Sequence, residues 1–181
     1  MSIARHWGTT PAERALPFPC DALIERPRDE LWRGVSADAP PTVVFRWLCQ
    51  LRAAPYSYDW IDNRGRRSPQ QLTPGLEDLE VGQRVMTIFT LASFERDVQM
   101  TLRVRGGTAS RLFGEAAVTY LVRPDGEGSR LLAKLVTRYP RNPLGWAMRL
   151  LLPWGDLVMM RRQLLNLKRL AEQAAADRVA P

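Results

Sequence analysis

The sequence has 181 residues, of which 45% are hydrophobic and 25% are charged. A chain of this length favours one domain and buries about 70% of its extended-chain surface, so a largely disordered protein is excluded. The net charge of +7 comes from arginines scattered along the chain, whereas a nucleic-acid binder gathers them in one stripe. We therefore do not expect a nucleic-acid partner.

The few histidines and cysteines argue against a metal site. His6 is the only histidine, and Cys20 and Cys49 lie 29 residues apart without paired spacing. Zinc sites need clusters of these residues, so we expect two reduced thiols, no metal and no other cofactor. The first residues contain no apolar run typical of secretion, and the most apolar segment, residues 143–160, is interrupted by Arg149, Pro153 and Asp156. A cytoplasmic protein is expected.

The first 81 residues divide into a proline-rich segment, a segment with strand and helix periodicity, and an irregular segment. Residues 1–30 are rich in proline and predict an extended N-terminal arm packed on a body of residues 31–175, with a frayed tail at 176–181. Residues 31–37 alternate and predict a strand, with Arg33 among its apolar positions. Asp38 is a candidate helix cap, and the helical spacing of apolar residues after it predicts a helix over 40–53. The irregular residues 54–81 predict a long lid-like loop with a short helix inside it.

From Gly82 onward, apolar residues recur at every second position, which predicts sequential antiparallel strands. Residues 84–94 form one bent strand or two, and strands are predicted over 98–104, 116–122 and 131–139, with a turn at 124–128. In the last strand, Arg130, Lys134 and Arg138 share one face, which we expect to be solvent-exposed. A helical region begins after Pro143, is expected to break near Pro153, and continues to about residue 175.

This order predicts an α+β fold in which a curved antiparallel sheet is wrapped around a long C-terminal helix. It resembles the SRPBCC superfamily, the helix-grip fold of START domains, Bet v 1-like proteins and polyketide cyclases. The resemblance covers roughly residues 6–172. It rests on the segments VSADAPP at 35–41 and VFRWL at 44–48. A narrower resemblance, to one bacterial branch, rests on WGTT at 7–10, PCD at 19–21, WLCQL at 47–51 and YSYDW at 56–60. The segment before Tyr56 is shorter here than that branch implies.

The superfamily resemblance implies a cavity between the sheet and the C-terminal helix. We expect it to hold a small hydrophobic, lipid- or polyketide-like ligand, because such sites are mostly apolar with a few polar groups. Tyr58, Trp60 and Asn63 belong to the loop that could cover such a ligand. The alternative is that these residues anchor the loop, with Asp59 and Asp62 bonding nearby backbone amides. The other candidate ligand-binding residues are Phe89, Met100, Tyr120, Tyr139, Trp154 and Met160, which could equally serve as plain core.

Three functions remain open at this point. The first is a non-catalytic binder or carrier. The second is a cyclase- or dehydratase-type enzyme without a metal, for which Asp59 and Tyr139 are the candidate proton-transfer residues. The third is an interaction module that acts through residues 143–160, as a monomer or homodimer. Basic residues beside the apolar stripe of the last helix are also typical of a membrane-surface helix, but peripheral membrane contact is not favoured, because that stripe is needed to fill the core.

Overall fold

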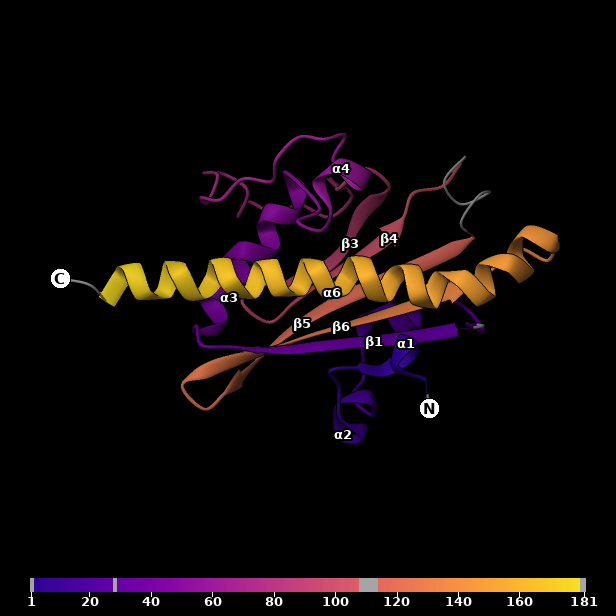
Figure 1. The fold of residues 1–181 in the computed structure, drawn as a ribbon, viewed down its shortest axis with the longest axis horizontal. Coiled ribbons are helices and arrows are strands. Elements are labelled where there is room, and N and C mark those ends of the chain that lie inside the picture. Colours follow the sequence, from indigo (N-terminus) through magenta and orange to yellow (C-terminus); the bar gives the residue numbers. More distant parts are fainter. Residues whose placement is uncertain (1, 28, 108–113, 180–181) are drawn as a thin grey trace.

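Six antiparallel strands form one curved sheet, and a single long helix runs along its concave face (Figure 1). The computed structural model describes residues 2–27, 29–107 and 114–179. The strand order is β1-β6-β5-β4-β3-β2. The strands are β1 (Asp29–Ala37), β2 (Arg84–Val85), β3 (Phe89–Glu95), β4 (Gln99–Val104), β5 (Glu115–Asp125) and β6 (Gly128–Arg138). The α+β helix-grip architecture predicted from the sequence is confirmed.

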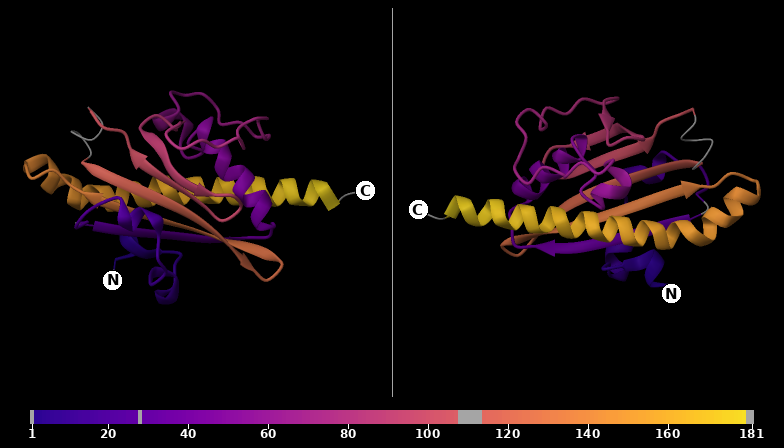
Figure 2. Two further views of the ribbon diagram at one scale, coloured as in Figure 1. Left: turned by 180° about the vertical axis from the view of Figure 1, so that it is seen from behind. Right: turned by 45° about the horizontal axis from the view of Figure 1, so that its top comes forward.

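The helices lie in front of the sheet and beside one of its edges. The short helices α1 and α2 lie beside the β1 edge of the sheet, where α1 contacts both β1 and α6, while α3 and α6 lie in front of the sheet and α4 belongs to the long loop (Figures 1 and 2). Their bounds are α1 (Ile3–His6), α2 (Pro11–Arg14), α3 (Pro41–Cys49), α4 (Asp59–Asp62) and α6 (Pro143–Val179), with 3-10 turns η1 (Pro19–Ala22) and η2 (Gln50–Arg52). The residue that caps α3 is Pro40, so the cap predicted at Asp38 is wrong. Within residues 84–95 there are two strands.

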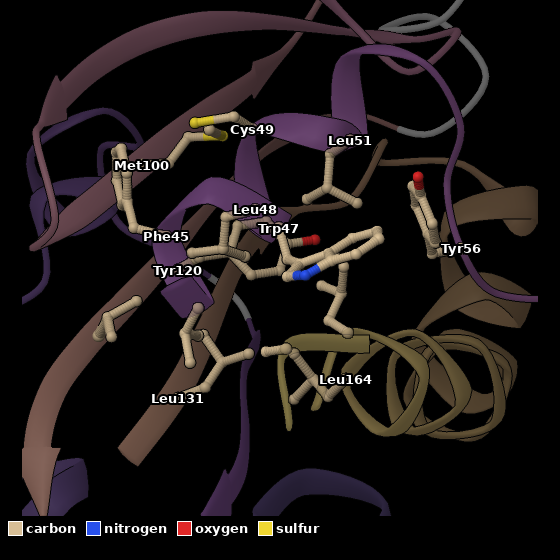
Figure 3. Packing of buried hydrophobic residues seen from close by; sticks show 14 of the residues in the cluster. Phe45, Trp47, Leu48, Cys49, Leu51, Tyr56, Met100, Tyr120, Leu131 and Leu164 are labelled. Atoms are coloured by element: carbon tan, nitrogen blue, oxygen red, sulfur yellow. The ribbon is translucent and has the colours of Figure 1, made fainter. Parts of the chain in front are cut away.

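The concave face is filled by apolar side chains where α3 and α6 cross it. Trp47 of α3 meets Tyr56 edge-on, with ring centroids 6.1 Å apart, and Leu164 of α6 packs in the same cluster (Figure 3). Leu131 and Tyr120 contribute from the sheet and are fully buried. The middle of the grip is therefore occupied by the protein's own side chains.

The convex face of the sheet is covered by the N-terminal region. Phe18, Cys20 and Ile24 pack against Leu132 and Val136 of β6 in a second apolar cluster. Lys134, on the same face of β6, is only 6% exposed. Its ammonium group pairs with Asp21 and Glu30 at 2.6 and 3.1 Å. The prediction that this face of β6 is solvent-exposed is wrong around Lys134, because the period-two pattern could not reveal that another segment covers it, whereas the Arg138 side chain is 41% exposed.

Helix α6 runs through Pro153 without a break, so the interruption predicted there is wrong. A proline removes one helical hydrogen bond and bends the axis. Figure 1 shows the N-terminal, orange part of α6 turned away from the straight remainder. This part of α6 packs along β1, and the guanidinium of Arg33 donates to the carbonyl oxygen of Pro153 at 3.3 Å.

Candidate functional site

A hollow of about 1060 Å³ opens at the end of the sheet where β6 leads into α6. It exists because β4 and β5 separate there. Their pairing ends at Arg103 and Ala117, whereas β5 stays paired with β6 as far as Glu115 and Arg138. The volume is at the upper end of ligand sites, which reach about 1,000 Å³. The described residues that line it are Thr90 and residues 103–106, 114–116 and 138–141.

Local backbone features hold the rim of the hollow in place. Gly114 has a φ of +78°, and a Cβ at this position would lie 2.4 Å from the carbonyl oxygen of Arg138. Only glycine permits this close approach of β5 to the end of β6. On the other side, the Asn142 side chain accepts a hydrogen bond from the Gly145 amide at 2.9 Å and caps α6, which begins with Pro143. A second depression of about 560 Å³ continues along α6 to Trp146 and Arg149.

The wall of the hollow combines apolar and cationic groups. Val104 and Ala116 are buried apolar residues on the concave side of the sheet. Arg138 pairs with Glu115 at 2.7 Å, so these two charges offset each other. Among the residues that the structure describes, no side-chain hydrogen bond or ion pair engages the remaining arginines, which are Arg103, Arg105 and Arg141. The hollow therefore carries a net positive charge at the end of the sheet, where Arg103 shares the convex face with its pairing partner Ala117, and Val104 and Ala116 lie on the concave face.

Tyr139 lies at the rim and lines both depressions. Its hydroxyl donates to Asp29 Oδ2 at 3.3 Å, and Asp29 is held by Arg5 through two hydrogen bonds of 2.9 Å. Burial raises the pKa of Tyr139 to about 12. The hydroxyl is thus protonated at neutral pH and is already bonded to a protein acceptor.

Tyr120 and Met160 meet inside the grip. The Tyr120 hydroxyl donates to Gln163 Oε1 at 2.7 Å and lies 3.6 Å from Met160 Sδ. The Gln163 amide donates in turn to the carbonyl oxygen of Pro55 at 2.6 Å. This chain of bonds ties β5 to α6 and to the start of the long loop. Burial raises the pKa of Tyr120 far above its usual value, so the hydroxyl stays protonated.

The polar residues of the loop bond to the loop itself. Asp59 accepts from the backbone amide and the hydroxyl of Ser68 at 2.9 and 2.5 Å. Asp62 accepts from the hydroxyl of Ser57, and the Asn63 amide donates to the carbonyl oxygen of Arg66 at 2.5 Å. These contacts match the loop-anchoring alternative, in which the carboxylates stabilise local turns.

The other candidate residues lie in different surroundings. Met100 is fully buried, and Phe89 is partly buried against the same core cluster. The Tyr58 ring lies 5.9 Å from the guanidinium of Arg162. Trp60 and Trp154 are 75% and 55% exposed. Of the candidates, the structure therefore gathers Met100, Tyr120 and Met160 in the interior and places Tyr139 alone at the hollow, and their role in ligand binding stays a prediction.

Two features were not anticipated from the sequence. The arginines of the hollow lie at strand ends far apart in the chain, and no local pattern brings them together. The second feature is an ion pair of 2.6 Å between Arg33 and Asp156, whose side chains are 1% and 9% exposed. The available signal was a charged residue at an apolar position of a strand and a lone carboxylate in an apolar segment. Each needs a partner if buried.

The described residues hold no cluster of histidine, cysteine or carboxylate groups suited to a metal. Burial raises the pKa values of the free thiols of Cys20 and Cys49 to about 11 and about 12, so neither is a ready nucleophile. Within the same ranges, no helix is both long and apolar enough to cross a lipid bilayer.

Several solved structures have a fold similar to that of this chain. Protein MLL2253 from Mesorhizobium loti matches with a TM-score of 0.51 and 14% identity, over 84% of this chain and 99% of that one. TTHA0849 from Thermus thermophilus matches with a TM-score of 0.51 and 17% identity, over 81% and 99%. The di-domain ARO/CYC StfQ from the steffimycin biosynthetic pathway matches with a TM-score of 0.51 and 13% identity, over 81% of this chain and 51% of that one.

The chain has the helix-grip fold of these solved structures, a curved antiparallel sheet that holds a long C-terminal helix. The resemblance drawn from the sequence is thereby confirmed at the level of the fold. No family model matches the sequence, and no curated protein is significantly similar to it. A helix-grip fold hosts many activities, so function has to be argued from the site.

Proposed function

We propose that the protein binds or carries a small amphipathic molecule, with an apolar body and an anionic group, in the hollow at the end of the sheet. The observation that supports this most strongly is that one hollow is lined both by the buried apolar residues Val104 and Ala116 and by Arg103, Arg105 and Arg141, which have no charged partner among the described residues. Apolar surface favours a hydrocarbon or aromatic body. Guanidinium groups favour a carboxylate, sulfate or phosphate.

The position of the proposed site differs from that expected from the sequence. The middle of the groove under α6 is occupied by the core cluster around Trp47, Tyr120 and Leu164. The open volume lies at the end of the sheet instead. A lipid- or polyketide-like ligand would therefore enter from the β6–α6 end, with its charged group among the arginines and its apolar part against β4 and β5.

A cyclase- or dehydratase-type enzyme is the alternative in the same hollow. Tyr139 is the candidate acid, because it lines the hollow and the carboxylate of Asp29 orients its hydroxyl. Asp59 is bonded to Ser68 and belongs to the loop. A pKa of about 12 makes Tyr139 a weak acid at neutral pH, and so binding without turnover is the function that the site supports better.

The proposal is tested by two probes with the same chain and opposite charge. Isothermal titration of the protein with decanoate should give binding, and decyltrimethylammonium should bind at least about tenfold more weakly, because its charge opposes the arginines. Arg105→Glu should weaken decanoate binding by about tenfold, while Arg84→Glu, an exposed change outside the hollow, should leave it unchanged. Equal affinity for both probes, or equal loss in both variants, would overturn the proposal.

A further inference from the structure

The N-terminal half of α6 carries an unusual concentration of exposed apolar side chains. Six of the ten large hydrophobic residues that are exposed among the described residues lie in this one stretch, and they are between 44% and 70% exposed. We call them the α6 apolar face: Leu144, Trp146, Leu150, Leu151, Trp154 and Val158. Soluble proteins rarely leave a contiguous patch of this kind open unless it binds something.

Helical geometry places these residues together. Trp146, Leu150 and Trp154 follow one another every four residues, and Leu151 and Val158 are separated by seven, so all lie on one side of a helix with 3.6 residues per turn. The opposite side faces the protein, as the ion pair of Asp156 with Arg33 shows. Further along α6 the apolar stripe turns inward, where Leu164 and Leu167 are fully buried. The exposed face thus belongs only to the part of α6 that extends beyond the core.

The charges around this face are of one sign. Arg141, Arg149, Arg161 and Arg162 lie before, within and after it, and Asp156 is the only acidic residue between positions 141 and 171. The carboxylate of Asp156 points inward and is paired with Arg33. An approaching surface therefore meets apolar side chains bordered by cations, with no exposed carboxylate on this part of the helix.

We propose that the α6 apolar face docks on an anionic lipid surface, with the helix axis parallel to the bilayer. An amphipathic helix with tryptophans on its apolar face and arginines at its border lies at the boundary of headgroups and acyl chains. The cations complement anionic headgroups. A second copy of the chain fits less well, because it would bring the same border of arginines against itself in a protein of net charge +7.

The location gives this docking a consequence for the hollow. Trp146 and Arg149 line the second depression, which shares Tyr139, Pro140 and Arg141 with the larger hollow. A protein docked through the α6 apolar face would therefore bring the entrance of the hollow close to the lipid. The docking inference goes beyond the proposed function and is independent of it, since either could hold without the other.

The test is flotation of the full chain with vesicles of two compositions, pure phosphatidylcholine and equal parts of phosphatidylcholine and phosphatidylglycerol. We expect co-flotation with the mixed vesicles, little with the pure ones, and loss in high salt as the charges are screened. The double variant Leu150→Gln/Leu151→Gln should partition at least about tenfold less. The matched control Ile3→Gln/Val81→Gln removes two exposed apolar residues elsewhere and should partition as the wild type does.

Tryptophan fluorescence supplies a second readout that does not depend on flotation. Brominated phospholipids in the mixed vesicles should quench the emission of the wild type, and Trp146→Phe/Trp154→Phe should lose most of that quenching. The inference is overturned if the protein does not float with the mixed vesicles, or if both double variants float equally. It is also overturned if sedimentation shows a dimer that only Leu150→Gln/Leu151→Gln abolishes, which would make a second copy the occupant.

Discussion

The guanidinium of Arg33 and the carboxylate of Asp156 lie 2.6 Å apart between the sheet and α6. Arg33 also donates to the carbonyl oxygens of Ala4 and Pro153, at 2.8 and 3.3 Å. One side chain of β1 therefore joins the N-terminal region, the sheet and the bend of α6. This ion pair therefore anchors the part of α6 that carries the exposed apolar face to β1.

Removing one partner of this pair should be strongly destabilising. Asp156→Ala leaves a buried, uncompensated guanidinium, so we expect a loss of about 3–5 kcal/mol in the free energy of unfolding by urea. The double variant Arg33→Met/Asp156→Leu removes both charges and should recover most of that loss. Glu115→Ala, which breaks the half-exposed pair with Arg138, should cost at most about 1 kcal/mol. An Asp156→Ala effect no larger than that of Glu115→Ala would contradict this account.

The same carboxylate should give a distinctive pH dependence. Burial raises the pKa of Asp156 from 3.8 to about 6, although Arg33 opposes the rise. Between these two pH values the folded protein holds a proton that the unfolded chain releases. This group's contribution to stability is therefore largest in acid, falls as the pH rises through the window, and is constant above it.

The measurement is the difference in unfolding free energy between wild type and Asp156→Asn across that window, since the asparagine does not titrate. Subtraction removes the contributions of the other carboxylates. We expect the difference, wild type minus variant, to decrease from about pH 4 to about pH 6. A difference that increases with pH would show that Arg33 dominates over burial.

Substitution of Gly8 tests how the N-terminal region is attached to β1. Its φ is +73°, and a Cβ there would lie 2.1 Å from the carbonyl oxygen of Gly34 in β1. Gly75 has a similar φ of +78° but open space around it. Gly75→Ala should therefore cost about 1 kcal/mol for backbone strain alone, whereas Gly8→Ala should cost more and should speed proteolysis of the arm. Equal costs measured by urea unfolding would mean that the contact with Gly34 is unimportant.

The substitution Tyr139→Phe tests whether the Tyr139 hydroxyl at the rim of the hollow stabilises the fold or contacts a ligand. The variant loses the hydrogen bond to Asp29, and bonds to charged groups contribute about 1.5–3 kcal/mol to stability. Because the hydroxyl is turned toward Asp29, decanoate binding measured by titration should change by less than about twofold. A large loss of binding would instead make the hydroxyl a direct ligand contact.

The spacing of apolar residues was sufficient to predict strands and helices, but not to predict which other segments cover them. The alternation of β6 and the helical spacing in α3 predicted both elements, because one face of each is buried in the core. Lys134 shows the limit, since its neighbours on the convex face are covered by a segment more than a hundred residues earlier in the chain. Pro153 shows another limit, because local rules predict a break in the helix, whereas α6 is continuous through this residue and packs on β1.

The site was less predictable than the fold. The aromatic and acidic residues of the long loop are of types that suit ligand binding, yet Asp59 bonds within the loop and Trp60 is exposed to solvent. The hollow arises from the separation of β4 and β5, and that is a property of strand register rather than of residue type. Its arginines, Arg103, Arg105 and Arg141, become a group only after the sheet forms.

The proposed binding site is tested most directly by locating decanoate with amide chemical-shift mapping of the isotope-labelled protein. Saturating decanoate is expected to shift the amides that surround the hollow, at Gly106, Gly114, Ala116 and Tyr139, and to leave those around Leu164 unchanged. No shifts at saturation, or shifts confined to the interior near Tyr120 and Leu164, would contradict it.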